Sequence, residues 1–390
     1  MDKKFVMGIA AMAALTLVSC SSDDLDSFSD NSSKNEAISF DGYLGRSAVA
    51  VNGTRGSVET KETLKTKGFG VFGKYDAGDG KTSDANFFVN QKVTYSNSKW
   101  TYTPLKYWPT QGQINFYAYA PHKEGQTLKE STNTFDFTVE PEAANQIDLL
   151  WANATGQIKT NFEGTTKEKV KFLFKHALSR LGYTVKLSGN YNSSDATFTL
   201  KKITLAGSPD DETKGAFYKT GIIDLSKTDS KENLSKTNTT TGLWTAATSA
   251  DNKQYFKWFD GSYIVESSGS KHPTNSDGVD YSDKDYLFVI PQDFSEKIEE
   301  AGQQKDNPDK LYVIVEYDVT YTSSSTKITN KVYKKLPIKF EQGKAYMLNL
   351  TIGLPIEFDV DVDTYAGVEP WDEVNDVPGD INSWDDISRK

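Results

Sequence analysis

Apolar and polar residues alternate with a period of two along most of this chain, and stretches with helical spacing are almost absent. This period turns apolar side chains to one face of a β-strand. Clusters of Gly and Asp, such as 76–80 and 207–211, separate the alternating stretches and favour tight turns. The only helix candidate is the charged run 296–303. We expect strands over residues 69–75, 114–119, 134–139, 183–187, 286–290, 311–321, 331–340 and 345–352.

Many strands without intervening helices indicate an all-β fold of antiparallel sandwiches rather than a parallel sheet. A hydrophobic content of 37%, with 12% aromatic residues, is adequate for a buried core. Roughly 350 folded residues exceed the usual size of one sandwich and fit two. We therefore predict two tandem antiparallel β-sandwich domains, over 37–165 and 166–371, followed by a C-terminal tail over 372–390.

The N-terminus has the pattern of a lipoprotein signal peptide. Lys3 and Lys4 precede an apolar run that leads into Ser19 and Cys20, and this order is typical of a removable signal. The run is shorter than the roughly 20 residues that a membrane-spanning helix needs. We predict that residues 1–19 are removed and that Cys20, the only cysteine, is acylated and anchors the protein to the outer membrane. The alternative is a plain secretory signal in which the cysteine stands by chance.

Residues 20–36 are predicted to form a flexible tether. They are mostly Ser, Asp, Asn and Lys, which is the composition of a disordered linker. Residues 21–24, Ser-Ser-Asp-Asp, resemble the acidic tag that sends lipoproteins of some anaerobic Gram-negative bacteria to the outer face of the outer membrane. The alternative is that they are only the start of the tether.

Charge and motif content exclude several classes of function. A formal charge of −10 and a pI of about 5.0 argue against a nucleic-acid partner. The mature chain has no disulfide or thiolate metal site, and its three histidines, His122, His176 and His272, lie far apart, so we expect no metal and no cofactor. The chain lacks the motifs of serine hydrolases, phosphate-binding loops and zinc proteases, which predicts that it is not an enzyme. A glycosidase needs only two carboxylates, and a sequence pattern does not reveal such a pair.

Two residues with functional side chains are better interpreted as structural. Trp108, next to Pro109, is expected to pack at the end of a sandwich rather than bind a sugar. His176 stands in an apolar alternation, which favours a buried histidine with its hydrogen bonds satisfied over a metal ligand or a base. Strand 114–119 is expected to be half-buried, with one face in solvent.

An acidic series near the C-terminus has two readings. Asp359, Asp361 and Asp363 could supply the oxygen ligands that Ca²⁺ prefers. No glycine-containing loop accompanies them, however, and they alternate with apolar residues. This pattern favours a strand with one solvated and one buried face. The residues of the buried face are Ile356, Phe358, Val360 and Val362.

Five segments, in this order, resemble the signature of the fimbrillin family. The first two are similar to "yWP" and "v.FyAyaP", and the next two to "DLL.A" and "v.f.FkHalsrl". The segments are 104–109, 114–121, 148–152, 170–181 and, near the end of the chain, 343–350. The match extends over most of the chain, whereas the stretch 188–280 contains no recognised motif.

The resemblance implies a structural function. Fimbrillins are type V pilin subunits of two transthyretin-like β-sandwich domains, exported as lipoproteins, cut after an arginine by a trypsin-like protease and polymerised by strand exchange. The expected partners are other pilin subunits and a ligand on a host or bacterial surface, and the expected locations are the outer membrane and the fimbrium. Strand exchange is physically sound, because a sandwich that lacks a strand exposes an apolar groove and unpaired backbone. A head-to-tail contact of this kind does not close and grows as a filament.

A different class of function remains as the alternative. A monomeric surface lipoprotein would bind glycans through exposed aromatic side chains. The candidates for such contacts are Trp244, Trp258 and Trp371.

The segment 37–44 is predicted to be a strand that maturation removes. Ile38, Phe40 and Leu44 fall on one face and can fill a groove. Arg46 and Arg55 follow, each flanked by small residues that suit a protease cleft. We prefer Arg55, because the family often shows "tR" there. The alternative is that both are ordinary loop arginines and the subunit is an uncleaved anchor.

The apolar face of Ile356, Phe358, Val360 and Val362 is the candidate donor strand, together with the tail that follows it. In the alternative, this strand completes the C-terminal sandwich of its own chain, and only the tail beyond is available to another subunit. The sequence does not choose between the two.

Overall fold

Strands account for most of the described chain, and the fold is all-β, as the alternation predicts. The computed structural model describes residues 37–44, 59, 61–78, 86–129, 131–159, 169–188, 195–227, 243–246, 252–265, 286–324, 326–353 and 357–364. The helical elements with both ends inside these ranges are α1 (Lys61–Lys67) and the 3-10 turn η1 (Ala143–Asn145). Neither is long enough to cross a membrane, and the described residues contain no other helix that is.

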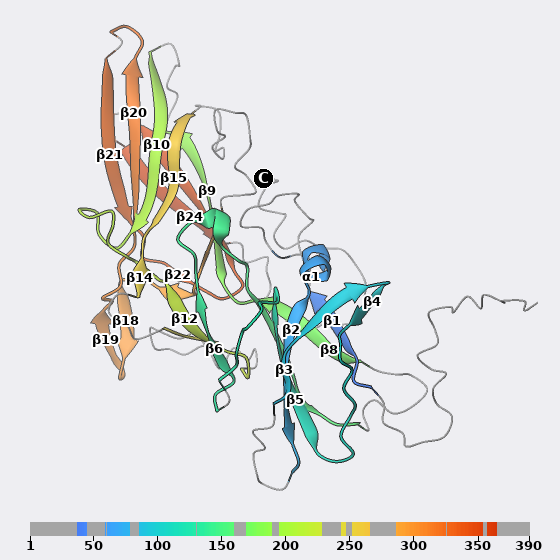
Figure 1. Cartoon of the computed structure of the whole chain (residues 1–390). Coiled ribbons are helices and arrows are strands. Elements are labelled where there is room, and N and C mark those ends of the chain that lie inside the picture. The colour runs from blue at the N-terminus through green and yellow to red at the C-terminus, as the bar shows by residue number, and fades with distance from the viewer. Residues whose placement is uncertain are drawn as a thin grey trace, which may run out of the picture.

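The first sheet has seven strands, in the order β1-β8-β7-β5-β2-β3-β4 (Figure 1). Their bounds are β1 Phe40–Leu44, β2 Phe69–Asp76, β3 Asn86–Ser96, β4 Lys99–Thr101, β5 Gln113–Ala120, β7 Leu150–Gln157 and β8 Val170–His176. Neighbours are antiparallel except for β1 and β8, which run parallel. β1 stands first in this order, yet it also lies close to β4, which stands last. The sheet therefore curls until its two ends approach each other.

Buried side chains fill the inside of this curled sheet, and we call them the first core. Trp108 belongs to it: its side chain is buried, and its ring meets the ring of Phe116 edge-on at 6.1 Å between centroids. The prediction that Trp108 packs in the core is confirmed. The complete set is Ile38, Phe40, Leu44, Leu64, Phe69, Val71, Phe88, Val93, Tyr102, Trp108, Ile114, Phe116, Ala118, Ala120, Leu150, Ala152, Val170, Phe172 and Phe174.

Two four-stranded sheets build the part of the molecule that stands at the upper left in Figure 1. One has the order β15-β10-β20-β21 and the other β16-β9-β23-β24. All their pairs are antiparallel except β9 with β23. Their bounds are β9 Ser179–Leu187, β10 Ala196–Ala206, β15 Phe256–Ile264, β16 Leu287–Val289, β20 Tyr312–Tyr321, β21 Lys327–Lys335, β23 Ala345–Gly353 and β24 Glu357–Thr364.

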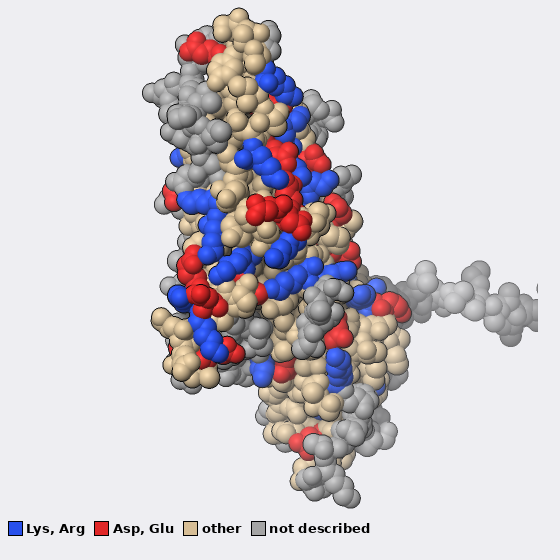
Figure 2. Space-filling view, turned by 90° about the vertical axis from the view of Figure 1, so that its left-hand side faces the viewer, with Lys and Arg blue, Asp and Glu red and all other residues tan. Residues whose placement is uncertain are grey.

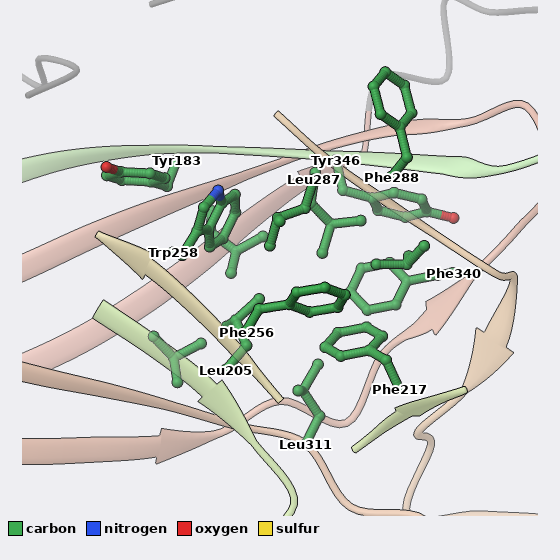
Figure 3. Packing of buried hydrophobic residues seen from close by; sticks show 14 of the residues in the cluster. Tyr183, Leu205, Phe217, Phe256, Trp258, Leu287, Phe288, Leu311, Phe340 and Tyr346 are labelled. Atoms are coloured by element: carbon green, nitrogen blue, oxygen red, sulfur yellow. The ribbon is translucent and has the colours of Figure 1, made fainter. Parts of the chain in front are cut away.

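Smaller sheets complete the fold. Three strands form the sheet β13-β12-β6, and three pairs are β11-β14, β17-β22 and β18-β19. Their bounds are β6 Thr134–Thr138, β11 Phe217–Tyr218, β12 Thr220–Asp224, β13 Trp244–Ala246, β14 Lys253–Gln254, β17 Gln292–Asp293, β18 Lys297–Glu300, β19 Gln303–Asp306 and β22 Lys339–Phe340. Together with the four-stranded sheets they enclose a second core. It includes Tyr183, Leu205, Phe217, Trp258, Leu287, Phe340 and Tyr346 (Figure 3).

Strand β5 is buried on both faces, so the expectation of a half-buried strand is wrong. Phe116 and Ala118 point into the first core, as one face of the strand should. Tyr117 and Tyr119 on the opposite face belong to the second core. The ring of Tyr119 lies 5.3 Å from that of Phe135 on β6. Elements distant in the sequence thus cover the face that the alternation assigns to solvent.

The predicted strands are confirmed in β2, β5, β6, β9, β16, β20 and β23, with ends shifted by a few residues. The predicted strand 331–340 is confirmed only in part, because β21 ends at Lys335 and β22 follows as a separate strand that pairs with β17. The predicted helix 296–303 is wrong, because this run forms the hairpin of β18 and β19. Ala301 and Gly302 have positive φ angles at its turn. Cross-strand ion pairs hold the two strands: Lys297 with Asp306, and Lys305 with Glu300. The helix that does form, α1, has no counterpart among the sequence predictions.

The predicted domain boundary lies between residues 165 and 166, just before β8. β8 pairs with β7 and β1 in the first sheet. β6 lies before the predicted boundary, yet it pairs with β12, which lies after it and borders the second core. The division at this point stays a prediction, and the strand pairing shows that each core uses strands from both sides of it.

Candidate functional site

β1 occupies a groove at the edge of the first sheet, and its side chains are the deepest part of the contact. Ile38 and Phe40 are each 1% exposed and Leu44 is 8% exposed. The Phe40 ring is surrounded by four others at centroid distances of 5.4 to 5.6 Å. Those rings belong to Phe88, Tyr102, Phe116 and Phe172. β1 therefore fills the centre of the first core rather than its rim.

The backbone of β1 is held from both sides. On one side it runs parallel to β8, with Phe40 opposite Val170 and Leu44 opposite Phe174. On the other side the amide N–H of Ile38 donates to the carbonyl of Lys106 at 2.8 Å. The buried Tyr102 hydroxyl donates to the carbonyl of Ile38 at 2.7 Å. The strand is short, yet both of its edges find partners near its N-terminal end.

Beyond β1, a buried group of polar side chains fixes the chain where it enters α1. The carboxylate of Asp148 lies 3.0 Å from Nδ1 of His176, and both side chains are 1% exposed. The same carboxylate accepts the backbone N–H of Glu59 at 2.8 Å. Asp148 and His176 stand in two of the signature segments, and here they meet. The prediction that His176 is buried and hydrogen-bonded is confirmed.

The Glu59 side chain joins this polar group to α1. It pairs with Lys67 at the end of α1, and its carboxylate accepts the Thr63 hydroxyl at 2.7 Å. Burial raises the pKa of Glu59 above its usual value, although the charge of Lys67 opposes this. Within the described residues, no cluster of three or more His, Cys, Asp and Glu could hold a metal ion.

The candidate donor strand is paired with its own chain. β24 runs antiparallel to β23 from Gly353 opposite Glu357 to Tyr346 opposite Thr364. Val360 is 5% exposed, Val362 is half-buried and Asp361 is exposed, so one face of the strand meets the second core. Ile356 lies outside the described residues, as does the side chain of Phe358.

Several predicted site residues lie outside the described residues. They are the signal peptide, Cys20, the tether, both arginines of the proposed cleavage, Arg46 and Arg55, and the tail from 372 onward. The expectations for them stay predictions.

Two of the three tryptophans proposed for glycan binding are buried. Trp244 is 1% exposed, and its indole N–H donates to the carbonyl of Ala177 at 2.6 Å. Trp258 is 6% exposed, and its ring packs against Tyr183 inside the second core (Figure 3). Trp371 lies outside the described residues. The two described tryptophans therefore support packing and not sugar binding.

Charged side chains on the side of β21 are interspersed by sign rather than gathered into one-sign patches (Figure 2). Glu212 pairs with Lys202 and Lys331, which lie on β10 and β21. Partial burial acts to raise the pKa of Glu212, but hydrogen bonds and charges from the two lysines outweigh it and lower the pKa to about 2. Glu316 on β20 also lies 3.7 Å from the Lys202 ammonium, so two carboxylates face two lysines in this network, which ties the strands together.

Sequence reasoning missed part of the groove around β1. The Tyr102 hydroxyl and the polar contact between Asp148 and His176 join residues far apart in the chain. Both residues of the polar contact stand in recognised segments, so their positions were a usable signal. Nothing in the local pattern marked Tyr102.

Comparison with known proteins finds similarity to fimbrial proteins over most of the chain. A sequence model of a family described as fimbrillin-like matches residues 54–371. The fimbrium subunit Fim1C of Phocaeicola vulgatus is 26% identical over 414 residues, which cover 96% of this chain and 98% of that protein. The crystal structure of a fimbrial protein from Bacteroides vulgatus has a TM-score of 0.59 and 19% identity, over 85% of this chain and 99% of that one. At this identity the structural likeness concerns the fold.

Proposed function

Because the chain belongs to the fimbrillin-like family, we propose that it is a structural subunit of a surface fimbrium, exported as a lipoprotein and joined to its neighbours by strand exchange. The relative named as a fimbrium subunit supports the fimbrial part of this proposal. The subunit acts by binding other subunits and not by catalysis. The fimbrium that it helps to build serves adhesion to a host or bacterial surface, and the proposal leaves open whether this subunit is stalk, tip or anchor.

One observation carries the strand-exchange part: a short terminal strand fills the centre of a core. β1 has five residues, and it is one of the two ends of the first sheet. Its loss would leave the rings around Phe40 exposed and the edge of β8 unpaired. An apolar groove beside an unpaired edge is the surface to which an extended segment adds as a strand. A strand from another subunit would restore both the burial and the ladder.

In this proposal cleavage couples release to assembly. The lipid at Cys20 holds the precursor at the outer membrane, with β1 between the anchor and the folded chain. A trypsin-like protease cuts after Arg55, or after Arg46 nearer to β1. The cut separates β1 from α1, so that β1 stays with the lipid and the groove becomes available.

The donor comes from the C-terminal part of another subunit. Two versions stand: the donor includes β24, or it is only the tail beyond it. Pairing of β24 with β23 favours the second version, because a strand already in its own sheet must first leave it. Deleting residues 374–390 should then reduce polymerisation and leave a folded monomer, whereas normal filaments from this truncation would remove the tail from the mechanism.

The test of the proposed function is the mature N-terminus of surface protein. It should be sequenced from wild type and from Arg46→Ala, Arg55→Ala and the double variant, beside electron microscopy of filaments. We expect wild-type filaments to begin after one of the arginines and the double variant to accumulate as uncleaved precursor. Filaments whose chains still begin at acylated Cys20 would contradict the cleavage mechanism. Replacing Cys20 with Ser should abolish acylation and membrane association, and a variant that still carries acyl chains would refute the lipoprotein assignment.

A further inference from the structure

Gly42 is the one position of β1 where an inward side chain is missing. Ile38, Phe40 and Leu44 fill the groove at alternate positions, and Gly42 stands between the last two. Its φ lies outside the left-handed region, so backbone conformation does not require glycine there. A Cβ atom added to Gly42 would lie 2.9 Å from Cε1 of Phe69. Space is therefore the physical reason for a glycine at this place.

The ring of Phe69, which limits the space beside Gly42, is held in place by its neighbours. Phe69 is fully buried, and its ring packs against those of Trp100, Phe172 and Phe174 at 4.9, 5.8 and 5.1 Å. The added Cβ would also meet Phe174 and Trp100 at 3.5 Å each. Only Trp100, which is half-buried, has solvent on one side. A larger residue at position 42 must displace this whole group, and overpacking of a filled core is destabilising.

We infer that the space between Phe69 and Trp100, which Gly42 now occupies, is a size filter in the groove and admits an incoming strand only if that strand has glycine at the same inward position. This inference rests on the proposed function, since it concerns the strand that replaces β1. The partner is a strand of another subunit with an apolar, an aromatic, a glycine and an apolar residue at successive inward positions. The inference thus defines the residue type of the incoming strand at its four inward positions and leaves the outward positions between them open.

The filter excludes the C-terminal strand of a second copy of this chain. If Phe358 takes the place of Phe40, then Val360 falls at the place of Gly42. A shift by two residues in either direction puts Val362 or Phe358 there instead. Each of these brings a side chain larger than a methyl group against the ring of Phe69. The pairing of β24 with β23 is a second, independent reason why this strand is not the donor.

Peptide competition tests the filter on the cleaved full-length protein. The chain is cut with an arginine-specific protease, because trypsin would also cut after its many lysines. A fluorescent peptide of residues 37–44 is then bound in the groove and followed by anisotropy. Unlabelled competitors are the same peptide, its Gly42→Val and Tyr43→Val variants, and the segment 355–362 with and without Val360→Gly. Tyr43→Val is the matched control, because it adds the same residue next to Gly42 at a position that is 44% exposed. Valine favours strands over glycine, so propensity alone predicts tighter binding for the Gly42→Val peptide, whereas tyrosine and valine at position 43 both favour strands.

We expect the Gly42→Val peptide to compete on the order of tenfold more weakly than the natural sequence, because overpacking outweighs propensity. The Tyr43→Val peptide should compete as well as the natural one, and Val360→Gly should improve competition by segment 355–362. Equal competition by the Gly42→Val peptide and the natural one would overturn the filter.

A second measurement separates the filter from the exchange mechanism. If the cleaved chain takes up no peptide at all, strand exchange is refuted, and the uncleaved chain then decides on the filter. Gly42→Val should lower its thermal stability relative to Tyr43→Val, and a combined Trp100→Ala should reduce that difference by giving Phe69 room to move. Without such coupling in the double-mutant cycle, the restriction at Gly42 would be refuted as well.

Discussion

β1 and β24 both complete a sheet at its edge, and they are attached in opposite ways. β1 has five residues and buries three side chains in the first core, counting Ile38 just before it. β24 has eight residues along β23, but of its described side chains only Val360 is buried. Among the described side chains, β1 therefore places more of its length in a core than β24 does. We expect the groove of β1 to select an incoming strand by shape more strictly than the edge beside β23 does.

The largest expected effect is at the centre of that groove. Phe40→Ala should lower the free energy of unfolding by about 3–5 kcal/mol, because it removes a buried ring with four aromatic neighbours. Urea denaturation of the full chain measures it, with Tyr43→Ala on the exposed face of the same strand as the control. A loss below about 1 kcal/mol would show that side-chain burial does not hold β1.

The second-largest loss of stability is expected at the buried polar group of Asp148, His176 and Glu59 beside α1. Asp148→Asn removes the charge that both His176 and the Glu59 N–H contact, and should cost about 1.5–3 kcal/mol of stability. The matched control is Asp361→Asn on the exposed face of β24, which should stay within about 0.5 kcal/mol of wild type. Equal losses in the two variants would contradict the view that this carboxylate is structural because it is buried.

A smaller effect is expected on β24. Val360→Ala removes two methyl groups that face the second core, at about 0.8 kcal/mol each. Hydrogen exchange should show faster opening of β24 than in wild type, with β23 still protected on its β9 side. If Val360→Ala destabilised the chain as much as Phe40→Ala does, the contrast between the two strands would be false.

The smallest effect concerns pH, and the two regions should differ in sign. Glu212 has a folded pKa of about 2 against an ordinary value of 4.5, so its contribution is complete above pH 4.5 and is lost as pH falls toward 2. Burial raises the pKa of Glu59, so on acidification Glu59 takes up its proton at a higher pH in the folded state than in the unfolded state. Acidification toward pH 4.5 therefore stabilises the fold through Glu59.

Thermal melts of Glu212→Gln and Glu59→Gln between pH 7 and pH 3 check these signs. The stability of wild type relative to Glu212→Gln should fall with acid. The stability of wild type relative to Glu59→Gln should rise as pH approaches 4.5. Parallel profiles for the two variants would mean that the surroundings of the two carboxylates do not differ as described.

The sequence predicted strands well because strand formation here depends on a local period. In 69–75 and 345–352 the period and the bounding turns coincide, and the strands lie within a residue of the prediction. The run 296–303 failed because its charges pair across a hairpin, with Lys297 opposite Asp306, and not along a helix. Local pattern carries no information on which distant residue stands opposite.

In the candidate site, too, local alternation predicts some features and long-range packing decides the others. The inward face of Ile38, Phe40 and Leu44 follows from alternation, and the structure buries all three. The restriction at Gly42 could not be predicted, since it depends on a ring from β2 that is fixed by others from β4 and β8. Long-range packing also decided against the tryptophans as sugar contacts, because a single sequence does not distinguish a buried indole from an exposed one.

The double burial of β5 would have a mechanical consequence in the filament that we propose. Phe72, Tyr117, Tyr119 and Trp151 lie on the outer face of the first sheet and are covered by the second core. Swinging the two cores apart would wet these side chains, at a cost on the order of 2 kcal/mol for each. The side-chain amide of Asn153 on β7 donates a hydrogen bond to the carbonyl of Leu225 at 2.8 Å, and this bond crosses the same junction. We therefore expect this junction to resist bending, so that in the proposed filament tension on the groove of β1 would reach the second core through it.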